Sequence, residues 1–175
     1  MHLPALPREA CGAKVISPYE STIEMGAQAQ ALCHVISKKT VACTHISAGL
    51  IVMPPHKVAR PHMHQEHEMV LFILEGWGAA LVGPDLEPIY HRPGDFIYIP
   101  AGVEHLGINL SRTERIVLAE IRTDPHFNDD LVVLPDLEEK AHQIAAELWT
   151  QFEAGTILPE AKRESAGPFK YQEAF

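Results

Sequence analysis

Short apolar segments separated by glycine and proline turns fill residues 32–122, and this alternation limits the fold more than any other feature of the sequence. The segments include CTHISAGLIVM, EMVLFILE, DFIYIP and RIVLAEI, and the turns include EGWG, VGPD and RPGD. We count seven or more short strands, a spacing typical of an antiparallel sandwich or barrel. A parallel βαβ fold is disfavoured because no helical pattern of about 10–15 residues separates the strands. The sequence therefore predicts an all-β, antiparallel domain over residues 32–125.

The N-terminal residues 1–31 differ from this region. Their three prolines, one of them in a Ser-Pro pair, are typical of an extended arm. Residues 21–32 could form a short helix, because Ser21 is a suitable N-cap and Glu24 follows three positions later. We therefore expect an N-terminal arm that contains a short helix.

A helical pattern replaces the strand pattern in the C-terminal segment, 126–175. Residues 134–152 place apolar side chains at helical spacing, at Leu137, Ala141, Ile144, Ala145 and Leu148. We expect this helix to cover an outer face of the barrel or of a partner subunit. Residues 155–175 are polar, contain two prolines and are predicted to form a tail.

Length and charge restrict the class of protein. The 175 residues fit one domain. A net charge of −9 with dispersed acidic residues argues against nucleic acid as a partner, because phosphates require a basic surface. No apolar stretch approaches the ~20 residues that span a bilayer, and the N-terminus does not resemble a signal peptide. We expect a cytoplasmic protein that binds a small-molecule substrate or ligand, with no nucleic-acid or membrane partner.

Three histidines and two glutamates lie close together in the segment RPHMHQEHEMVLFILEG, residues 60–76. His62 and His64 are two positions apart, so on a strand they present both imidazoles to one side. A third ligand further along the strand, together with His105 from a neighbouring strand, would give nitrogen and carboxylate ligands that suit a divalent transition metal. The alternative is a histidine-rich surface loop without a metal.

A second pattern follows at residues 94–109. Gly94-Asp95 forms a turn before the apolar run FIYI, and Pro100-Ala-Gly102 then forms a corner. Proline cannot donate to a strand ladder and glycine can adopt positive φ, so this corner ends one strand and orients the next. His105 therefore lies at the start of a strand.

These two patterns resemble the motifs of the cupin superfamily, in the single-domain conserved-barrel form. Residues 94–109 meet every element of the second motif, G-x5-P-x-G-x2-H-x3-N. His62, His64 and Glu68 match the ligand core of the first motif, and Gly76 matches its closing glycine. The resemblance implies an antiparallel double-stranded β-helix, also called a jelly roll or cupin barrel. It also implies one divalent transition metal per chain, Fe(II), Mn(II), Ni(II), Cu(II) or Zn(II), and the ligand set His62, His64, Glu68 and His105.

The first motif departs from the family pattern in its spacing. Seven residues separate Glu68 from Gly76, where the pattern has six, so the strand carries a bulge or the turn is longer. Because strand side chains alternate, a slip of one residue changes the ligand. Counting forward from His64 selects Glu68, whereas counting back from Gly76 places Met69 and His67 on the ligand face. We expect Glu68 as the third ligand, with His67 as its competitor.

Two further residues are candidates near the site. Arg60 precedes the first ligand, where it could hold a carboxylate or phosphate of the substrate or could be a solvated turn residue. His91 could line the pocket, but we favour a role in capping a turn.

Fold alone does not determine the activity. We favour a metal-dependent enzyme that acts on a small oxygenated metabolite, with dioxygenase-like oxidoreduction ahead of isomerase, epimerase or decarboxylase activity. The alternative from another class is a non-catalytic cupin that binds a sugar or organic acid. Because exposed barrel edges invite strand pairing, we also expect a homodimer.

Overall fold

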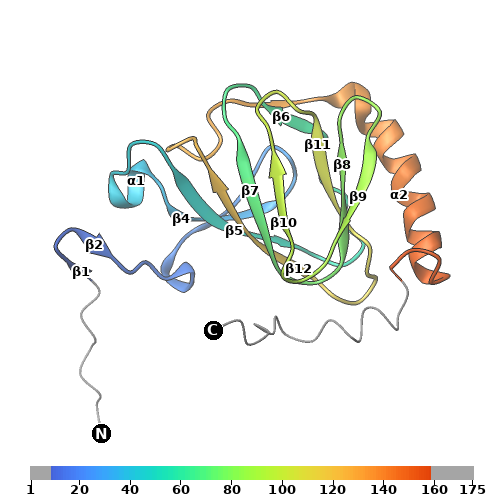
Figure 1. The fold of residues 1–175 in the computed structure, drawn as a ribbon, viewed down its shortest axis with the longest axis horizontal. Coiled ribbons are helices and arrows are strands. Elements are labelled where there is room, and N and C mark those ends of the chain that lie inside the picture. Colours follow the sequence, from blue (N-terminus) through green and yellow to red (C-terminus); the bar gives the residue numbers. More distant parts are fainter. Residues whose placement is uncertain (1–8, 159–175) are drawn as a thin grey trace, which may run out of the picture.

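The computed structural model describes residues 9–158 of the chain, and Figure 1 shows its two sheets and the long helix beside them. The strands are β1 (Glu9–Ala10), β2 (Ala13–Lys14), β3 (Ile23–Met25), β4 (Ala31–Ile36), β5 (Ser47–Met53), β6 (His62–His64), β7 (Met69–Glu75), β8 (Gly78–Val82), β9 (Glu87–His91), β10 (Phe96–Ile99), β11 (His105–Asn109), β12 (Ile116–Arg122) and β13 (Leu131–Val133). The helices are η1 (Pro18–Glu20), α1 (Lys38–Val41), η2 (Pro135–Leu137) and α2 (Glu138–Glu153), where η marks a 3-10 helix.

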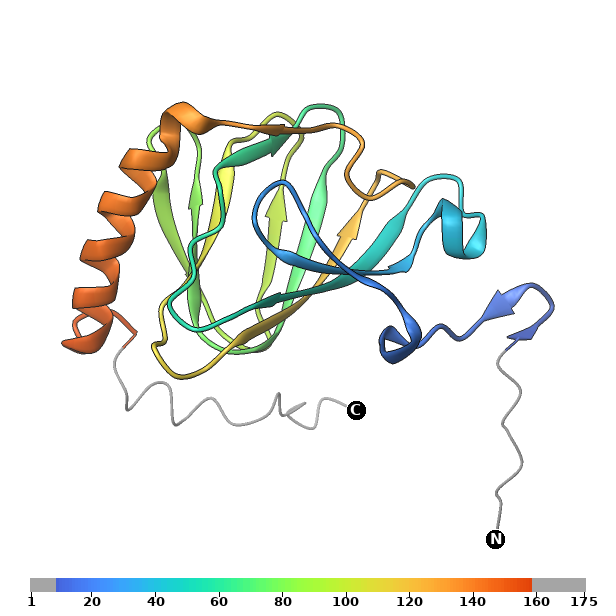
Figure 2. The same cartoon turned by 180° about the vertical axis from the view of Figure 1, so that it is seen from behind.

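Two antiparallel sheets form the barrel. The larger sheet has the strand order β10-β7-β12-β5-β4-β3, and the smaller has the order β13-β6-β11-β8-β9. The sheets face each other, so the inward side of each strand contributes to one interior (Figures 1 and 2). This arrangement confirms the predicted all-β, antiparallel double-stranded β-helix.

Alternation of side chains explains why these segments form strands around one core. Along β5 the residues from Ser47 to Met53 are alternately buried and half-buried, as expected for a strand with one face on the core. Ile51 of β5, Ile73 of β7 and Ile108 of β11 belong to the same buried cluster. Burying each such side chain contributes roughly 1.5–3 kcal/mol to folding, so the core is sufficient to fix the pairing of the two sheets.

The N-terminal segment corrects one prediction. The short helix expected over residues 21–32 is absent, and β3 pairs there with β4 through a turn in which the Gly26 N–H donates to the Gln30 carbonyl at 2.9 Å. Leu32 is almost fully buried in the core, so tertiary pairing overrides the local helix signal. Before β3, the exposed β1–β2 hairpin lies away from the barrel (Figure 2). The larger sheet thus begins ahead of residue 32.

The C-terminal segment contains the expected helix. Helix α2 lies beside β8 and β9 in both views (Figures 1 and 2), and its buried residues are Ala141, Ala145, Leu148 and Phe152. The indole of Trp149 donates to the Asn109 carbonyl at 2.9 Å, which ties the helix to β11. No helix within residues 9–158 is long and apolar enough to cross a membrane. The predicted tail lies outside the described residues from position 159 onward.

Gly76 of the first motif and Asn109 of the second motif hold turns of the barrel in place. Gly76 has a φ of 85°, and a Cβ there would lie 2.4 Å from the Arg115 carbonyl oxygen, so the β7–β8 turn requires glycine. Asn109 is fully buried, and its amide donates to the carbonyls of Met53, Pro54 and Glu114. These bonds fix the far end of β11, the strand that begins with His105.

Candidate metal centre

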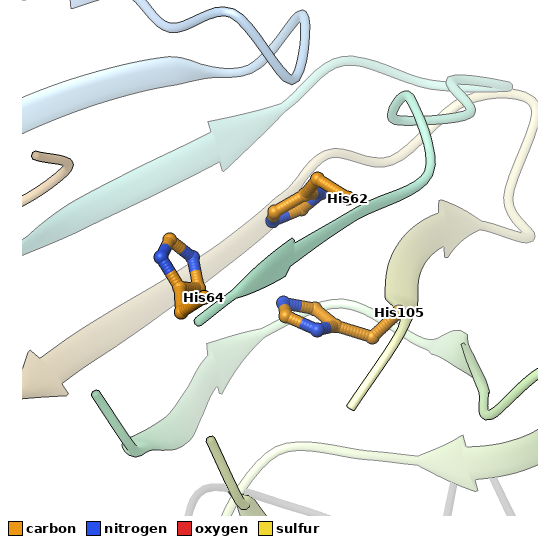
Figure 3. Close-up of side chains that lie close together, drawn as sticks. All are labelled: His62, His64 and His105. Carbon is orange, nitrogen blue, oxygen red and sulfur yellow. The ribbon is translucent and has the colours of Figure 1, made fainter. Parts of the chain in front are cut away.

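Three histidines converge inside the barrel. His62 and His64 come from β6 and His105 from β11, and His62 lies directly opposite His105 in the antiparallel pair. One ring nitrogen of each residue lies within 4.8 Å of the corresponding atoms of the other two, and Figure 3 shows the three rings facing a common space. All three side chains are buried, with 3–5% of each residue exposed. The strand pairing therefore brings together the three histidines that the sequence predicted.

Each of the three rings is held by its Nδ1 atom. The Nδ1 of His62 donates to the Arg60 carbonyl and that of His105 to the Val103 carbonyl, both at 2.9 Å. The Nδ1 of His64 lies 3.2 Å from Asp130 Oδ1, which accepts, and 3.4 Å from Nη1 of Arg122, which can only donate. The shorter contact, with the carboxylate, places the proton on Nδ1. With the proton on Nδ1, the lone pair is on Nε2, and the Nε2 atoms of His64 and His105 are buried without a hydrogen-bond partner among the described residues. Histidines that bind metals are oriented in this way.

Burial keeps these imidazoles neutral. It lowers the pKa of His64 to about 4, helped by the charge of Arg122, and it lowers the pKa of His105 to about 4 as well. Burial and the neighbouring His105 also hold the pKa of His62 well below its usual value. Since a metal binds the neutral imidazole, all three rings are competent ligands at pH 7.

Asp130 connects the buried site to the surface. Its Oδ1 accepts from His64, and its Oδ2 accepts from the ring of His67 at 2.9 Å and from the backbone N–H of Glu66. Burial alone would raise the pKa of Asp130, but these donors together lower it to about 2. Asp130 follows His64 by 66 positions in a segment that the sequence assigned to the C-terminal region, so sequence reasoning missed it.

Glu68, the predicted third ligand, is not at the site. Glu68 is exposed, and its carboxylate accepts a hydrogen bond from the Tyr98 hydroxyl. His67 is held by Asp130 and belongs to a second cluster with Asp124 and Asp130, not to the three-histidine cluster. Within residues 9–158, no carboxylate lies within 4.8 Å of all three histidine ligand atoms. The structure therefore differs from the predicted ligand set at Glu68 and at its competitor His67.

A β-bulge explains the irregular spacing of the first motif. Val117 pairs with Glu75 and the next residue, Leu118, pairs with Ile73, so Leu74 is the extra residue in β7. Leu74 is 43% exposed, whereas Met69 is 4% exposed and lines the barrel cavity. The inward position at the start of β7 therefore belongs to Met69, which agrees with the count back from Gly76.

The cavity next to the histidines occupies about 500 Å³, including its opening to solvent. Its walls are mainly apolar, and its polar lining residues are Gln30, His62, His91, His105, Glu120 and Arg122. His91 is buried and lines this cavity, and burial lowers its pKa to about 4. The expectation that His91 caps a turn is therefore wrong, because its position at the end of β9 directs it inward.

A buried ion pair lies on the larger sheet, and Nη1 of its Arg122 is 3.4 Å from Nδ1 of His64. Glu120 Oε1 lies 2.5 Å from both Nε and Nη2 of Arg122, and both side chains are 0–1% exposed. The Nη1 of Arg122 donates to the Phe127 carbonyl and to Asn128. Burial raises the pKa of Glu120, and the contact with Arg122 opposes this shift. Sequence reasoning missed this pair, although in RIVLAEIR strand alternation places Glu120 and Arg122 on the face of Ile116 and Leu118.

Arg60 lies outside the cavity. Its Nε donates to Glu138 Oε1 at 2.7 Å, and Nη1 donates to the Ala27 carbonyl at 3.5 Å. The side chain is exposed and directed toward the start of α2. The structure thus gives Arg60 a role in docking the helix and does not support the predicted role in substrate binding.

The architecture and the converging histidines define a double-stranded β-helix with a candidate metal site. Residues 49–120 match the family model described as "Cupin domain". This part of the chain, which carries all three histidines, is therefore a cupin domain. No curated protein sequence matches the chain.

Several solved structures have a similar fold at low sequence identity. An uncharacterized double-stranded β-helix protein from Klebsiella pneumoniae is 13% identical, covers 69% of this chain and 96% of its own, and has a TM-score of 0.55. A predicted oxalate decarboxylase from Thermotoga maritima is 18% identical, with coverage of 62% and 97% and a TM-score of 0.54. The polyketide cyclase RemF from Streptomyces resistomycificus is 15% identical, with coverage of 78% and 96% and a TM-score of 0.57. These similarities show the fold alone.

Proposed function

We propose that the barrel binds one divalent transition metal through the Nε2 atoms of His62, His64 and His105. We further propose that the protein is a metal-dependent enzyme acting on a small oxygen-containing molecule. One observation carries this proposal: three buried, neutral imidazoles have Nδ1 anchored and their ligand atoms within 4.8 Å of one another. An unpartnered buried nitrogen is costly unless something binds it, and two of these Nε2 atoms are unpartnered among the described residues.

The residues around this centre would bind and orient the substrate. The apolar walls of the cavity exclude water from the substrate, and the anchors at Arg60, Val103 and Asp130 hold the three rings in place. When bound, the metal would supply Lewis-acid polarisation of a substrate oxygen or, as Fe(II), activation of dioxygen. Three neutral nitrogens leave the full positive charge of the ion available for either reaction.

Metal titration of the purified full chain tests the centre. We expect one equivalent of Zn(II), Fe(II) or Mn(II) to bind, and His105→Ala to weaken binding by more than about 100-fold. His142→Ala is the matched control, since His142 is an exposed histidine on α2. Equal metal affinity of the wild type and His105→Ala would reject the site.

The reaction class requires a separate measurement. Oxygen uptake by the iron-loaded protein with candidate diols or organic acids would support dioxygenase-like chemistry. Turnover without oxygen uptake would support isomerase, epimerase or decarboxylase chemistry. Tight binding of a sugar or organic acid with no turnover would favour the second candidate, a non-catalytic binding protein.

We also propose that the protein is a cytoplasmic homodimer. Strand β3 lies at the edge of the larger sheet, and Ile23 and Met25 on it are exposed. An exposed apolar edge strand favours pairing with a second chain. Light scattering should therefore give twice the chain mass of 19.4 kDa, and a monomer mass would contradict the proposal.

A further inference from the structure

One oxygen atom in the barrel wall has no partner. Glu120 is 0% exposed, its Oε1 is held by Arg122, and its Oε2 has no hydrogen-bond partner among the described residues. Glu120 lines the same cavity as His62 and His105, but it comes from the opposite sheet. Leaving a buried acceptor unsatisfied costs about 1–3 kcal/mol, and more for a charged group. This atom therefore requires a donor from outside the described residues.

The neighbouring cation does not provide that donor. Nε and Nη2 of Arg122 contact the other oxygen of Glu120. Nη1 donates to Phe127 and Asn128 and lies 3.4 Å from Nδ1 of His64. The guanidinium is therefore already engaged by protein oxygens, and its charge is balanced by Glu120. A carboxylate ligand would face the Glu120 charge without a separate cation from this wall to offset the repulsion.

The rest of the cavity surface sets the shape of the ligand. Apolar side chains of the larger sheet line the cavity beside Glu120, among them Leu71, Ile116 and Leu118. The cavity and its opening to solvent together enclose about 500 Å³. The surface thus matches a compact apolar body that carries a single hydrogen-bond donor directed at Glu120.

We propose that the Glu120 carboxylate is the recognition group for a small, largely apolar molecule that donates a hydrogen bond from a hydroxyl or amino group. The inference deepens the proposed function and rests on it for the identification of this cavity as the substrate site. Glu120 is a specificity-determining residue, and it comes from the sheet that faces the metal ligands. The substrate would present its donor to Glu120 while its reacting oxygen lies toward the histidines.

Binding measurements on the metal-free full chain test the proposal without any contribution from a metal. The probes are benzyl alcohol, benzylamine, toluene and benzoate, which share a ring and differ in the polar group. We expect benzyl alcohol or benzylamine to bind about tenfold more tightly than toluene and benzoate, as a hydrogen bond to a charged group predicts. Whichever of benzyl alcohol and benzylamine binds more tightly indicates whether the substrate donates from a hydroxyl or from an amino group. Equal binding of all four probes would show that water satisfies Oε2 and would overturn the proposal, as would a preference for benzoate.

The substitution Glu120→Gln should reverse the preference of the cavity from donor probes to acceptor probes. In Glu120→Gln, the amide oxygen must face Arg122, because a guanidinium only donates, and the amide NH₂ then faces the cavity. We expect benzylamine to bind about tenfold more weakly and the acceptor probe acetophenone to bind more tightly. Glu75→Gln is the matched control, because Glu75 forms an exposed ion pair with Arg115. Unchanged probe preferences in a folded Glu120→Gln variant would refute the assignment.

The two proposals fail in different ways. If Glu120→Gln does not fold, the wild-type probe series alone decides the role of Glu120. Failure of the metal titration with an intact donor preference would reject the metal-dependent function and retain the binding role of Glu120. Metal binding without a preference for donor probes would retain the metal-dependent function and reject the binding role of Glu120.

Discussion

The two sheets of the barrel hold their buried polar groups in different ways. The smaller sheet carries His62, His64 and His105, which are neutral and held by single hydrogen bonds at Nδ1. The larger sheet carries Glu120 and Arg122, which form a charged pair. A neutral ring can be buried at modest cost, whereas a buried ion depends on its partner. The comparison shows that the smaller sheet buries neutral imidazoles, whereas the larger sheet buries a pair of charges that neutralise each other.

The charged pair gives the largest expected effect. Arg122→Leu leaves Glu120 buried without its partner, so we expect the free energy of unfolding to fall by about 3–5 kcal/mol. Urea denaturation followed by circular dichroism measures this loss. The double variant Glu120→Leu/Arg122→Leu should be more stable than Arg122→Leu, because it contains no unpaired charge. A single variant as stable as the wild type would show that the larger sheet does not depend on the pair.

An intermediate effect is expected from substitution of Asp130, the carboxylate that holds the ring of His64. Asp130→Asn weakens the acceptor of the His64 Nδ1 proton, so we expect metal affinity to fall by about 10–100-fold. The measurement is calorimetric titration with Zn(II). Asp129→Asn is the control, since Asp129 is exposed and does not contact His64. Equal affinities of the two variants would show that the hydrogen bond to Asp130 is not needed for binding.

The histidine wall also predicts a pH dependence for the metal-free protein. His64 and His105 have folded-state pKa values of about 4, below the value of about 6.5 in an unfolded chain. The unfolded state therefore binds more protons between these values, and stability falls as the pH is lowered from about 6.5 to 4. Thermal denaturation at several pH values should show this loss, and His105→Ala should reduce it. An unchanged pH profile in that variant would contradict the neutral state of His105.

The smallest effect is expected where the two walls meet. Met69 is the inward residue at the start of β7, and Met69→Glu would add a carboxylate to the cavity that His62 and His105 line. We expect metal affinity to rise by about tenfold, since each added anionic ligand strengthens cation binding. Calorimetric titration compares this variant with Glu68→Gln, in which the exposed carboxylate is neutralised. Loss of affinity in Glu68→Gln would instead restore Glu68 as a ligand.

Sequence patterns predicted the barrel and the three histidines because both depend on strand alternation and on turns that only a few residue types can form. The helix over 134–152 was also visible, since its apolar spacing is regular. The helix expected over 21–32 failed because Leu32 is buried by pairing with a distant strand, which local signals do not report. Asp130 was missed for a similar reason, because its partner His64 lies 66 positions away. Arg122 was missed although its partner Glu120 is two positions away, since this apolar segment was interpreted only as a strand.

The bulge at Leu74 makes the two ends of β7 independent of each other. It absorbs one additional residue at the end next to Gly76, while Met69 at the other end keeps its pairing with Ile99 and Arg122. Changes of chain length in the β7–β8 hairpin can therefore accumulate without moving the residues that face the cavity. For protein engineering, such a change is confined to the bulge itself, because Gly76 and the buried Trp77 leave no space in the turn.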